Sequence, residues 1–538
     1  MRRSYAIATP AVAALGLALG CAATPNPPST TAAAPAAAPA AAAPATAAPA
    51  PTTAATAARE TPDGPFRQQP PSAAAEPVFH PPRWKRFKLK NGLDVFLVEM
   101  HDLPLVDFNL MVKTGGAANP PDRAGLADLT ANMLDEGTTT RSALDIAKGI
   151  ASLGATLSTG STWDASNVSL STLTRNLDPA LELFADVVQH PAFDPIEFAR
   201  VRDNLITAIT RRKDSPPTVA NLALARLLYG PKHPYGWPMT GTEEPIKKLT
   251  TADLRGFYDA NYRPNNAALI VAGDTTEAAL RGKLEAAFAK WRGKHVAAHK
   301  LPAPGTANSA TKIYLIDKAD APQSSIRVGV IGIERTNPDY FPVTVMNLIF
   351  GGGFYRLDLN LREGKGWTYG ARSIFDSRRA PGPFSAGGEF VAPHSADSVA
   401  EILKELNGMR DADVADAELT RAKDQIVKSY PARFATRANI AAQLAELAIF
   451  NLPDSYISDY TKRIAAVTKE DVRRVARKYL DPQRLTVVVV GDRKTLQEPL
   501  AKLAPVEVRD LDGDPIVAAP AAGKQPEPPT AAASGQNK

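Results

Sequence analysis

The chain has 538 residues, of which 44% are hydrophobic and 22% charged, with 47 prolines and a formal net charge of +6. Its single cysteine excludes a disulfide scaffold and any zinc or iron–sulfur site built on cysteine ligands. The positive charge is spread along the chain without a block of Lys or Arg, so it does not indicate a nucleic-acid partner. The length would suit three or four domains, but only if all of it folds.

The start of the chain is predicted to be an export signal, residues 1–21, that ends at the cysteine. Two arginines precede an apolar stretch, residues 6–20, which is too short to span a bilayer. Small residues before Cys21 resemble a bacterial lipobox, although Ala18 stands where Leu is usual. An ordinary secretory signal with an incidental Cys21 is the alternative. We predict acylation of Cys21. Ala22, rather than an Asp, follows it, which by resemblance to other lipoproteins implies an outer-membrane lipoprotein facing the periplasm of a bacterial cell envelope.

Two segments are predicted to stay extended and disordered. Residues 22–83 are rich in Ala, Pro and Thr, and residues 516–538 in Ala, Pro, Gly and polar side chains. Such segments carry too few large apolar side chains to offset the entropy lost on ordering. The first would be a tether and the second a tail. No stretch after the signal reaches about 18 uninterrupted apolar residues, so none is predicted to span a membrane.

The sequence between these segments is an internal duplication with a constant offset of 218 residues. Val-Phe-Leu-Val-Glu at 95–99 matches Ile-Tyr-Leu-Ile-Asp at 313–317. Near the other end, Leu-Thr-Thr-Ala-Asp-Leu at 249–254 matches Val-Thr-Lys-Glu-Asp-Val at 467–472. Equal offsets at both ends predict two homologous halves, residues 84–291 and 311–515, joined by a linker at 292–310.

Each half is predicted to contain the same elements in the same order. Alternating apolar residues predict two strands, a helix follows, and two more strands precede a pair of amphipathic helices and a last strand. The predicted ranges are 93–99, 106–113, 124–135, 155–173 (two strands), 178–188, 195–212 and 267–272 in the first half, and 312–317, 325–333, 341–350, 367–391 (two strands), 396–408, 416–429 and 485–490 in the second. The fold class is therefore α+β: two duplicated halves, each a mixed, mostly antiparallel sheet covered by helices.

Three features together resemble the insulinase/pitrilysin peptidase family, the inverzincins. They are the duplication, the phrase Gly-Leu-Ala at 125–127 opening a helix, and Asn-Leu-Arg-Glu at 360–363 before Gly-Trp-Thr-Tyr at 366–369. The resemblance covers about residues 84–510 and implies a clamshell-like pair of halves. In active members the helix carries H-x-x-E-H, whose histidines bind Zn²⁺ while the Glu activates a water, and a distant Glu completes the site.

The positions that match this motif have lost its chemistry. Asp128 and Asn132 stand at the two histidine positions, Ala131 at the base, and Ala208 at the distant Glu. Only Asp128 is a plausible ligand, whereas a zinc site needs about three protein ligands and a base near its water. We therefore predict that the chain carries no catalytic zinc and no cofactor of its own, and that zinc belongs to a partner subunit.

No other motif replaces the lost one. His295 and His299 have the i, i+4 spacing of two metal ligands on a helix. They lie in the linker with no Glu between them, so we interpret them as two solvated residues. The chain has no G-x-S-x-G elbow, no P-loop and no G-x-G-x-x-G. Neither nucleophilic hydrolysis nor nucleotide binding is predicted.

The resemblance assigns a role to two residues of the second half. In active members an Arg and a Tyr seven residues apart hold the substrate and stabilise the developing oxyanion, and Arg362 and Tyr369 match them. The alternative is an Arg in a surface ion pair and a Tyr that packs on the core. Gly351, Gly352 and Gly353 would let backbone approach a bound peptide, or simply let a helix end turn.

A chain without the zinc motif but with the Arg/Tyr pair resembles the non-zinc subunit of two-chain bacterial members and of mitochondrial processing peptidase. This implies a noncatalytic, peptide-binding subunit of a heterodimeric metallopeptidase, whose partner is a zinc-motif-bearing family member. Peptides would add as a strand to a sheet edge. The alternatives are a binding or scaffold protein without a role in proteolysis, and a peptidase with relocated metal ligands, for which the sequence offers no candidate cluster.

Overall fold

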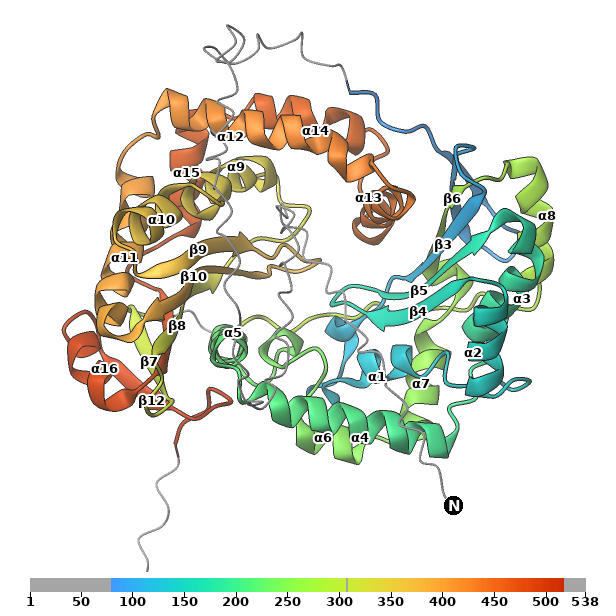
Figure 1. Cartoon of the computed structure of the whole chain (residues 1–538), viewed down its shortest axis with the longest axis horizontal. Helices are drawn as coiled ribbons and strands as arrows, with labels where there is room; N and C mark the ends of the chain where they lie inside the picture. The colour runs from blue at the N-terminus through green and yellow to red at the C-terminus, as the bar shows by residue number, and fades with distance from the viewer. Residues whose placement is uncertain (1–78, 306–307, 517–538) are drawn as a thin grey trace, which may run out of the picture. The chain divides into compact units, whose positions relative to one another are not determined.

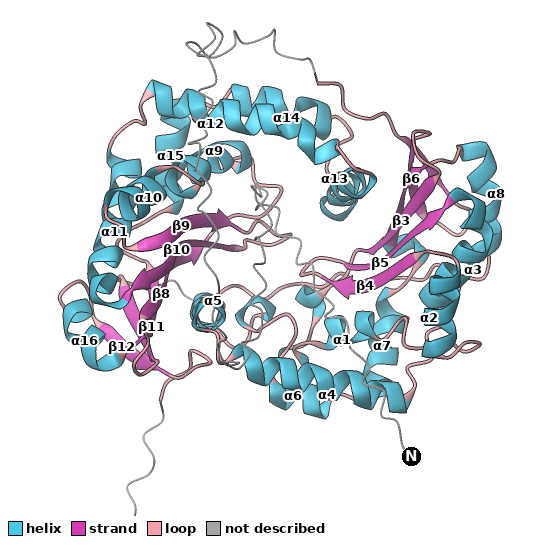
Figure 2. Ribbon diagram, viewed as in Figure 1, coloured by secondary structure: helices cyan, strands magenta, loops and turns pink. Residues whose placement is uncertain are grey.

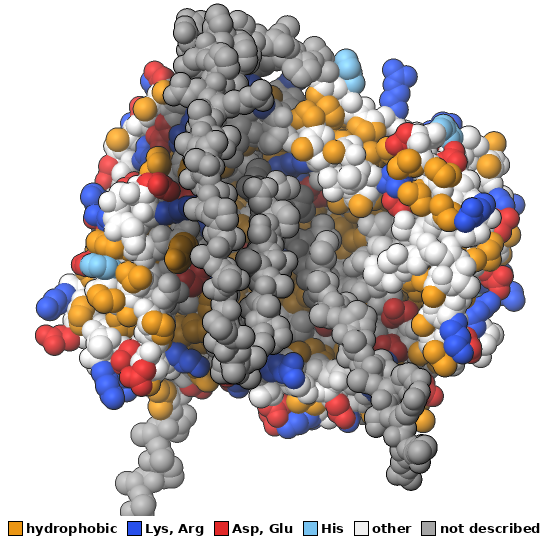
Figure 3. All heavy atoms as spheres, in the orientation of Figure 1, with side chains coloured by type: hydrophobic (Ala, Val, Ile, Leu, Met, Phe, Trp, Pro, Cys, Tyr) orange, Lys and Arg blue, Asp and Glu red, His pale blue; other side chains and the backbone are white. Residues whose placement is uncertain are grey.

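The computed structural model describes residues 79–305 and 308–516 (Figure 1). The predicted signal, Cys21, nearly all of the tether and nearly all of the tail lie outside the described residues. The described residues from Pro81 onward belong to one compact unit. Among the described helices, none combines the length and the apolar character needed to cross a bilayer. Lys and Arg side chains are interspersed with Asp and Glu over the face seen in Figure 3.

The first sheet contains six strands in the order β1-β2-β6-β3-β5-β4. Only β2 and β6 are parallel, and every other neighbouring pair is antiparallel. The central strand β6 is buried along its whole length, whereas β5 alternates between buried and half-buried residues. The strands are β1 Lys85–Lys88, β2 Asp94–Glu99, β3 Leu105–Val112, β4 Thr156–Ser161, β5 Ser166–Leu173 and β6 Ala267–Gly273.

The second sheet repeats this plan in the order β12-β7-β11-β8-β10-β9. Its strands are β7 Lys312–Asp317, β8 Gln323–Ile331, β9 Thr368–Phe375, β10 Pro383–Val391, β11 Thr486–Gly491 and β12 Val506–Arg509. The two sheets differ at one edge. In the first, β1 precedes β2 and pairs with it antiparallel, whereas in the second β12 comes from the end of the fold and pairs parallel with β7.

The strand registers of the two sheets agree with the duplication. Leu269 of β6 lies between Val95 and Leu110, and Val487 of β11 lies between Ile313 and Val328, each 218 positions later. A shared register follows from a shared hydrophobic pattern, because a slip by one residue would turn every apolar side chain out of the core. The predicted fold class, two duplicated α+β halves, is confirmed.

Helices cover both sheets (Figure 2). Asp194 caps α4 by accepting from the backbone N–H of Ile196 at 2.8 Å, as its Asp-Pro start predicts. The helix predicted at 124–135 is shorter, because Gly125 has a left-handed φ of +95° and α1 begins only after it. The helices are α1 Leu126–Asn132, α2 Ala143–Ser152, α3 Leu177–Gln189, α4 Pro195–Arg212, α5 Pro216–Tyr229, α6 Glu243–Lys248, α7 Thr251–Asn261, α8 Glu277–Ala287, α9 Tyr340–Gly351, α10 Arg356–Asp358, α11 Ser395–Asp411, α12 Asp416–Ser429, α13 Arg437–Phe450, α14 Tyr456–Ala465, α15 Lys469–Tyr479 and α16 Arg493–Ala501.

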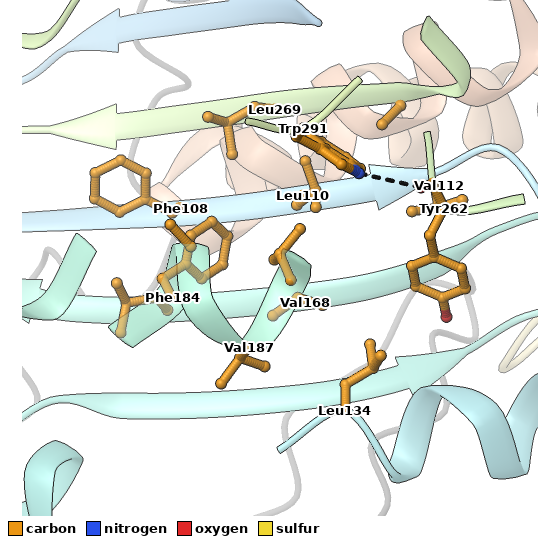
Figure 4. Close-up of a cluster of buried hydrophobic side chains, with 14 of the residues drawn as sticks. Phe108, Leu110, Val112, Leu134, Val168, Phe184, Val187, Tyr262, Leu269 and Trp291 are labelled. Carbon is orange, nitrogen blue, oxygen red and sulfur yellow. Dashed lines mark hydrogen bonds between the residues drawn. The ribbon is translucent and has the colours of Figure 1, made fainter. Parts of the chain in front are cut away.

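The core of the first half lies between its sheet and helices that include α1, α3, α7 and α8. Phe108 of β3 and Phe184 of α3 are almost fully buried, with ring centroids 5.9 Å apart (Figure 4). The indole N–H of Trp291 donates to the carbonyl oxygen of Tyr262 at 3.1 Å, which attaches the end of this half to its core. A buried indole that finds an acceptor adds packing without leaving an unsatisfied donor.

Each sheet is also covered by a helix from the other half. Helix α5, which follows α4, packs on β8 and β11 of the second sheet, and α13, which follows α12, packs on β3 and β6 of the first. Arg437 of α13 forms an ion pair with Asp107 of β3 at 3.2 Å, and Arg327 of β8 donates to Asn221 of α5 at 2.7 Å. The two halves therefore share their cores through an exchange of equivalent helices.

Candidate functional site

The helix that matches the zinc motif is packed tightly at its start. A side chain at Gly125 would lie 2.6 Å from Ile246 Cδ1 and 2.8 Å from the carbonyl oxygen of Thr240. Asp128 is only 7% exposed, and the side-chain amide of Asn132 donates to its Oδ2 at 3.2 Å. Burial raises the pKa of Asp128 to about 6, because the ionised carboxylate loses its hydration and gains only this amide as a partner.

The other motif positions offer no ligand. Ala131 is completely buried, and Ala208 lies exposed on α4, which packs against α1. Among residues 79–305 and 308–516, no three His, Cys, Asp or Glu side chains come close enough to hold a metal ion. A lone carboxyl group whose pKa is raised by burial is a weak ligand, because a metal binds its deprotonated form. The residues present therefore do not fit a catalytic zinc ion.

The histidines of the linker do not form a helical pair. Residues 292–305 contain no helix or strand, so His295 and His299 do not share a helix face. His295 and His299 are both exposed, and His299 Nε2 lies 3.0 Å from the side-chain oxygen of Asn261. Partial loss of hydration beside α7 lowers the pKa of His299, which favours its neutral form. Both histidines are therefore surface residues, and His299 in addition contacts Asn261 at the end of α7.

Arg362 lies on a π-helical turn, Leu359–Gly364, that continues α10. Its side chain is 39% exposed, forms an ion pair with the adjacent Glu363 at 3.3 Å, and places its guanidinium 5.7 Å from the centroid of the Phe354 ring. Irregular helical turns of this type often occur at functional sites. A surface ion pair of Arg362 was the alternative considered from the sequence. The guanidinium is half-exposed, however, so it keeps N–H donors available to a ligand.

Tyr369 is the second residue of β9, and its side chain is 89% exposed. Ala371 of β9 faces Gly388 of β10, but Thr368 faces Phe390, so the two residues Tyr369 and Gly370 stand opposite one residue. This is a β-bulge, which redirects side chains and often occurs beside active sites. The equivalent ladder between β4 and β5 pairs without a shift. Packing of the Tyr369 ring on the core, the alternative considered from the sequence, is therefore wrong.

The bulge is held by local hydrogen bonds and requires one glycine of the adjacent strand. Thr368 Oγ1 accepts from the backbone N–H of Gly370 at 3.1 Å and donates to the carbonyl oxygen of Glu389 at 2.7 Å. A side chain at Gly388 would overlap the carbonyl oxygen of Gly370. The close approach of the two backbones thus requires glycine at position 388.

The three glycines at the end of α9, Gly351 to Gly353, have different surroundings. A side chain at Gly351 would collide with Ser373 of β9, whose Cβ would lie 2.6 Å away, and one at Gly352 would lie 2.6 Å from the carbonyl oxygen of Leu348. Packing within the chain therefore accounts for both residues. At Gly353 the nearest atom, Arg372 Nη2, is 3.6 Å away, so a methyl group would fit. A contact between these glycines and a peptide stays a prediction.

A buried carboxylate connects this loop to the bulged strand. Asp358 is completely buried and accepts from the backbone N–H groups of Phe354 at 3.1 Å and Ala371 at 3.0 Å, and it forms an ion pair with Arg372. Burial by itself would raise the pKa of Asp358, but the hydrogen bonds from Arg372 and the two amides hold it below its usual value. The carboxylate therefore stays ionised and keeps the loop attached to β9.

Phe354, Asp358 and the bulge were not predicted from the sequence. Phe354 has a left-handed φ of +61°, yet its side chain is 61% exposed. A single sequence has no signature for such a conformation in a Phe. The one available signal was the pair Gly370 and Gly388 in two adjacent strands, since glycine inside a strand often marks a bulge.

A separate cavity of about 770 Å³ lies between α4, α5, α6 and the loop around Asp512 and Asp514. Its charged side chains are largely neutralised by each other: Lys213 pairs with Asp512 at 3.1 Å, and Arg226 pairs with Asp514 at 2.9 Å. None of the site residues predicted from the sequence lines this cavity.

Two family models match the chain. The model described as insulinase (peptidase family M16) matches residues 95–234, and the model described as the peptidase M16 inactive domain matches residues 248–426. Among curated relatives, an uncharacterized zinc protease of Bacillus subtilis is 24% identical over 343 residues, which are 64% of this chain and 82% of the relative. An uncharacterized zinc protease of Streptomyces coelicolor is 25% identical over 421 residues, which are 77% of this chain and 90% of the relative.

Solved structures agree with this assignment. A peptidase M16 inactive domain from Pseudomonas fluorescens is 29% identical with a TM-score of 0.71, and the match covers 76% of this chain and 98% of that one. A protease from Helicobacter pylori shares the fold, with 20% identity and a TM-score of 0.70 over 77% of this chain and 100% of that one. With the duplicated sheets, the degenerate motif helix and these matches together, the chain belongs to the insulinase family, peptidase family M16.

Proposed function

We propose that this protein is the noncatalytic, peptide-binding subunit of a heterodimeric insulinase-family metallopeptidase, in which a second family member supplies the zinc motif. The observation that carries the proposal is the contrast between its two halves. The motif helix holds alanines and a buried Asp128, whereas Tyr369 is 89% exposed on a β-bulge that follows Arg362 in the chain. A chain that has lost its metal ligands but keeps this pair exposed is suited to act on a substrate held by a partner.

The chemistry of the pair fits this role. A guanidinium and a phenol hydroxyl both donate hydrogen bonds, and donors aimed at a carbonyl oxygen that gains negative charge lower the barrier to peptide hydrolysis. Strand β9 is the last strand of its sheet, but its outer edge already bonds Asp358 at Ala371 and Asn347 at Ser373, so the peptide would contact the Arg362 and Tyr369 side chains there. In this arrangement the chain binds and orients the peptide, and the zinc-bearing partner provides the water-activating groups.

The test is purification of the protein alone and together with a family member from the same organism that has an intact H-x-x-E-H. We expect peptidase activity only in the mixture, and a decrease in kcat on the order of 100-fold for Arg362→Ala, since loss of one oxyanion donor has this effect. Arg484→Ala is the control, because Arg484 is an exposed Arg paired with Asp481 in another region. Unchanged activity of the Arg362→Ala mixture would show that the assigned role is wrong.

A scaffold protein without a role in proteolysis is the alternative outcome of the same experiment. It would co-purify with other proteins but not with a zinc-bearing family member. Zinc analysis of the protein alone tests the third interpretation, a peptidase with relocated ligands. We expect far less than one zinc per chain, and a stoichiometric zinc content would contradict the proposal.

We further propose that the protein is anchored in the outer membrane through a lipid on Cys21, with the folded part in the periplasm. The support is the sequence around Cys21, which lies outside the described residues. Growth with labelled palmitate should label the wild-type protein but not Cys21→Ala, and the variant should move from the membrane fraction to the soluble periplasmic fraction. Labelling that persists in Cys21→Ala would contradict the anchor.

A further inference from the structure

Phe354 combines a strained backbone with an exposed ring. Its φ of +61° lies in a region that residues with a side chain rarely adopt, and its side chain is 61% exposed. Two side chains hold its backbone: Asp358 accepts from its N–H at 3.1 Å, and Arg421 donates to its carbonyl oxygen at 3.1 Å. Strain that surrounding groups enforce is typical of functional sites. The structure thus holds an aromatic ring in water at a defined position.

Gly353 and Gly370, the neighbours of Phe354 and Tyr369 in the chain, lie beside the same cation. Methyl groups built on Gly353 and on Gly370 would each lie 3.6 Å from Nη2 of Arg372. Gly353 precedes Phe354, and Gly370 follows Tyr369 in the bulge. The loop and the bulge therefore meet at this guanidinium, which places the two exposed aromatic residues on neighbouring segments.

Asp358 connects these two segments. It is completely buried, and its partners are the N–H of Phe354, the N–H of Ala371 just after the bulge, and Arg372. A buried carboxylate is costly unless hydrogen bonds and an opposite charge compensate for its lost hydration. Because the compensating groups come from the loop and from the strand, Asp358 couples their positions. It is a positioning residue for both aromatic side chains.

From this geometry we propose that Phe354 and Tyr369 form a subsite for a large apolar or aromatic side chain of a bound peptide. This subsite deepens the peptide-binding function proposed above and rests on it. The two rings expose apolar surface that such a side chain would remove from water, and contacts between aromatic rings add to that gain. The outer edge of β9 beside Ala371 and Ser373 is already bonded to Asp358 and Asn347, so the subsite is formed by side chains and not by strand addition at these residues.

The experiment uses the full chain and two fluorescein-labelled Gly/Ser decapeptides that differ at one central residue, Phe or Ala. Fluorescence anisotropy measures both affinities. We expect the wild-type protein to bind the Phe peptide on the order of tenfold more tightly, as apolar subsites discriminate by such factors. Phe354→Gly should abolish this preference without weakening the binding of the Ala peptide. The same variant should raise the melting temperature of the protein, because glycine adopts a left-handed φ without strain.

Two further variants separate specificity from stability. Leu144→Ala removes an apolar side chain that is 61% exposed on α2, and it should leave the preference unchanged. Asp358→Asn should reduce the ratio of the two affinities, because the loop and the strand lose their charged link. Equal binding of both peptides by the wild type, or a preference that survives in Phe354→Gly, would overturn the subsite alone. A protein that binds neither peptide would overturn the proposed peptide-binding function and the subsite with it.

Discussion

At the scale of single residues, the degenerate zinc motif shows how a ligand position changes its physical role. In an active member this position holds a neutral histidine that binds the metal. In this chain Asp128 is buried with only the amide of Asn132 as a partner, and burial raises its pKa to about 6. The folded protein therefore binds a proton at Asp128 more tightly than the unfolded chain does, where the pKa is near the ordinary 3.8.

This difference predicts a pH-dependent stability. Because the folded-state pKa is the higher one, the free energy of unfolding should fall as the pH rises from about 4 to about 6, and by no more than roughly 3 kcal/mol. Above that range the ionised Asp128 is a constant penalty. Asp128→Asn should flatten this part of the profile and make the protein more stable at pH 7.5. Urea unfolding at pH 5 and pH 7.5 measures both effects.

The control for Asp128→Asn is Asp102→Asn, because Asp102 is exposed in the loop between β2 and β3. Asp102→Asn should change neither the pH dependence of the free energy of unfolding nor its value at pH 7.5. A profile of Asp128→Asn that is as steep as that of the wild type would mean that Asp128 is not the titrating group. Asp135, whose pKa burial also raises to about 6, would then be the next carboxyl group to replace.

At the scale of elements, the contact between α9 and β9 determines how the candidate site is presented. The end of α9 packs directly on Ser373, and Asn347 donates to the carbonyl oxygen of Ser373 at 3.2 Å. The next segments, the loop with Phe354 and the turn with Arg362, then lie beside the bulged strand. Gly351 and Gly352 thus permit tight packing at the end of the helix, whereas Gly353 begins the open loop.

Gly351→Ala and Gly353→Ala form a matched pair that tests this division. At Gly351 the added methyl group collides with the backbone and side chain of Ser373, so we expect a loss of roughly 1–3 kcal/mol in stability. At Gly353 the nearest atom is 3.6 Å away, so we expect a change below about 1 kcal/mol. Thermal unfolding of both variants measures the difference. Equal melting temperatures would show that α9 does not pack on β9 in this way.

At the scale of the whole compact unit, the exchange of α5 and α13 makes the halves interdependent. Leu224 of α5 is 3% exposed, and a side chain at Gly329 of β8 would lie 2.8 Å from its Cδ2. The hairpin loops also meet: the backbone N–H of Arg379 donates to Asp164 at 3.0 Å, and the Arg378 guanidinium lies 4.5 Å from the centroid of the Trp163 ring. Either half alone would expose the sheet face that the other half covers.

This interdependence predicts complementation. If the chain is divided at residues 306–307, each part expressed alone should aggregate or bind a dye for exposed apolar surface, because a sheet without its covering helix leaves apolar residues in water. Co-expressed parts should co-purify and unfold in one thermal transition. A soluble, cooperatively folded half would contradict the prediction.

Much of this architecture is predictable from local patterns in the sequence. The offset of 218 residues implied two copies of one fold, and the ranges 195–212 and 416–429 agree with α4 and α12 because a helix start and an amphipathic face depend on nearby residues. The loss of the motif chemistry is equally local, since Ala131 and Ala208 have no ligating group in any fold. Strands β1 and β12 were not predicted, because short edge strands carry little pattern of their own.

The sequence by itself thus determined the duplicated α+β fold, the family resemblance and the absence of the motif's ligands at their expected positions. Only the tertiary structure decided which helix covers which sheet, that Tyr369 is exposed on a bulge, and that Asp358 links this strand to Phe354. The physical reason is the range of the interactions. Periodicity and capping act over a few residues, whereas a bulge, an exchanged helix or a buried carboxylate depends on contacts between segments that the sequence keeps apart.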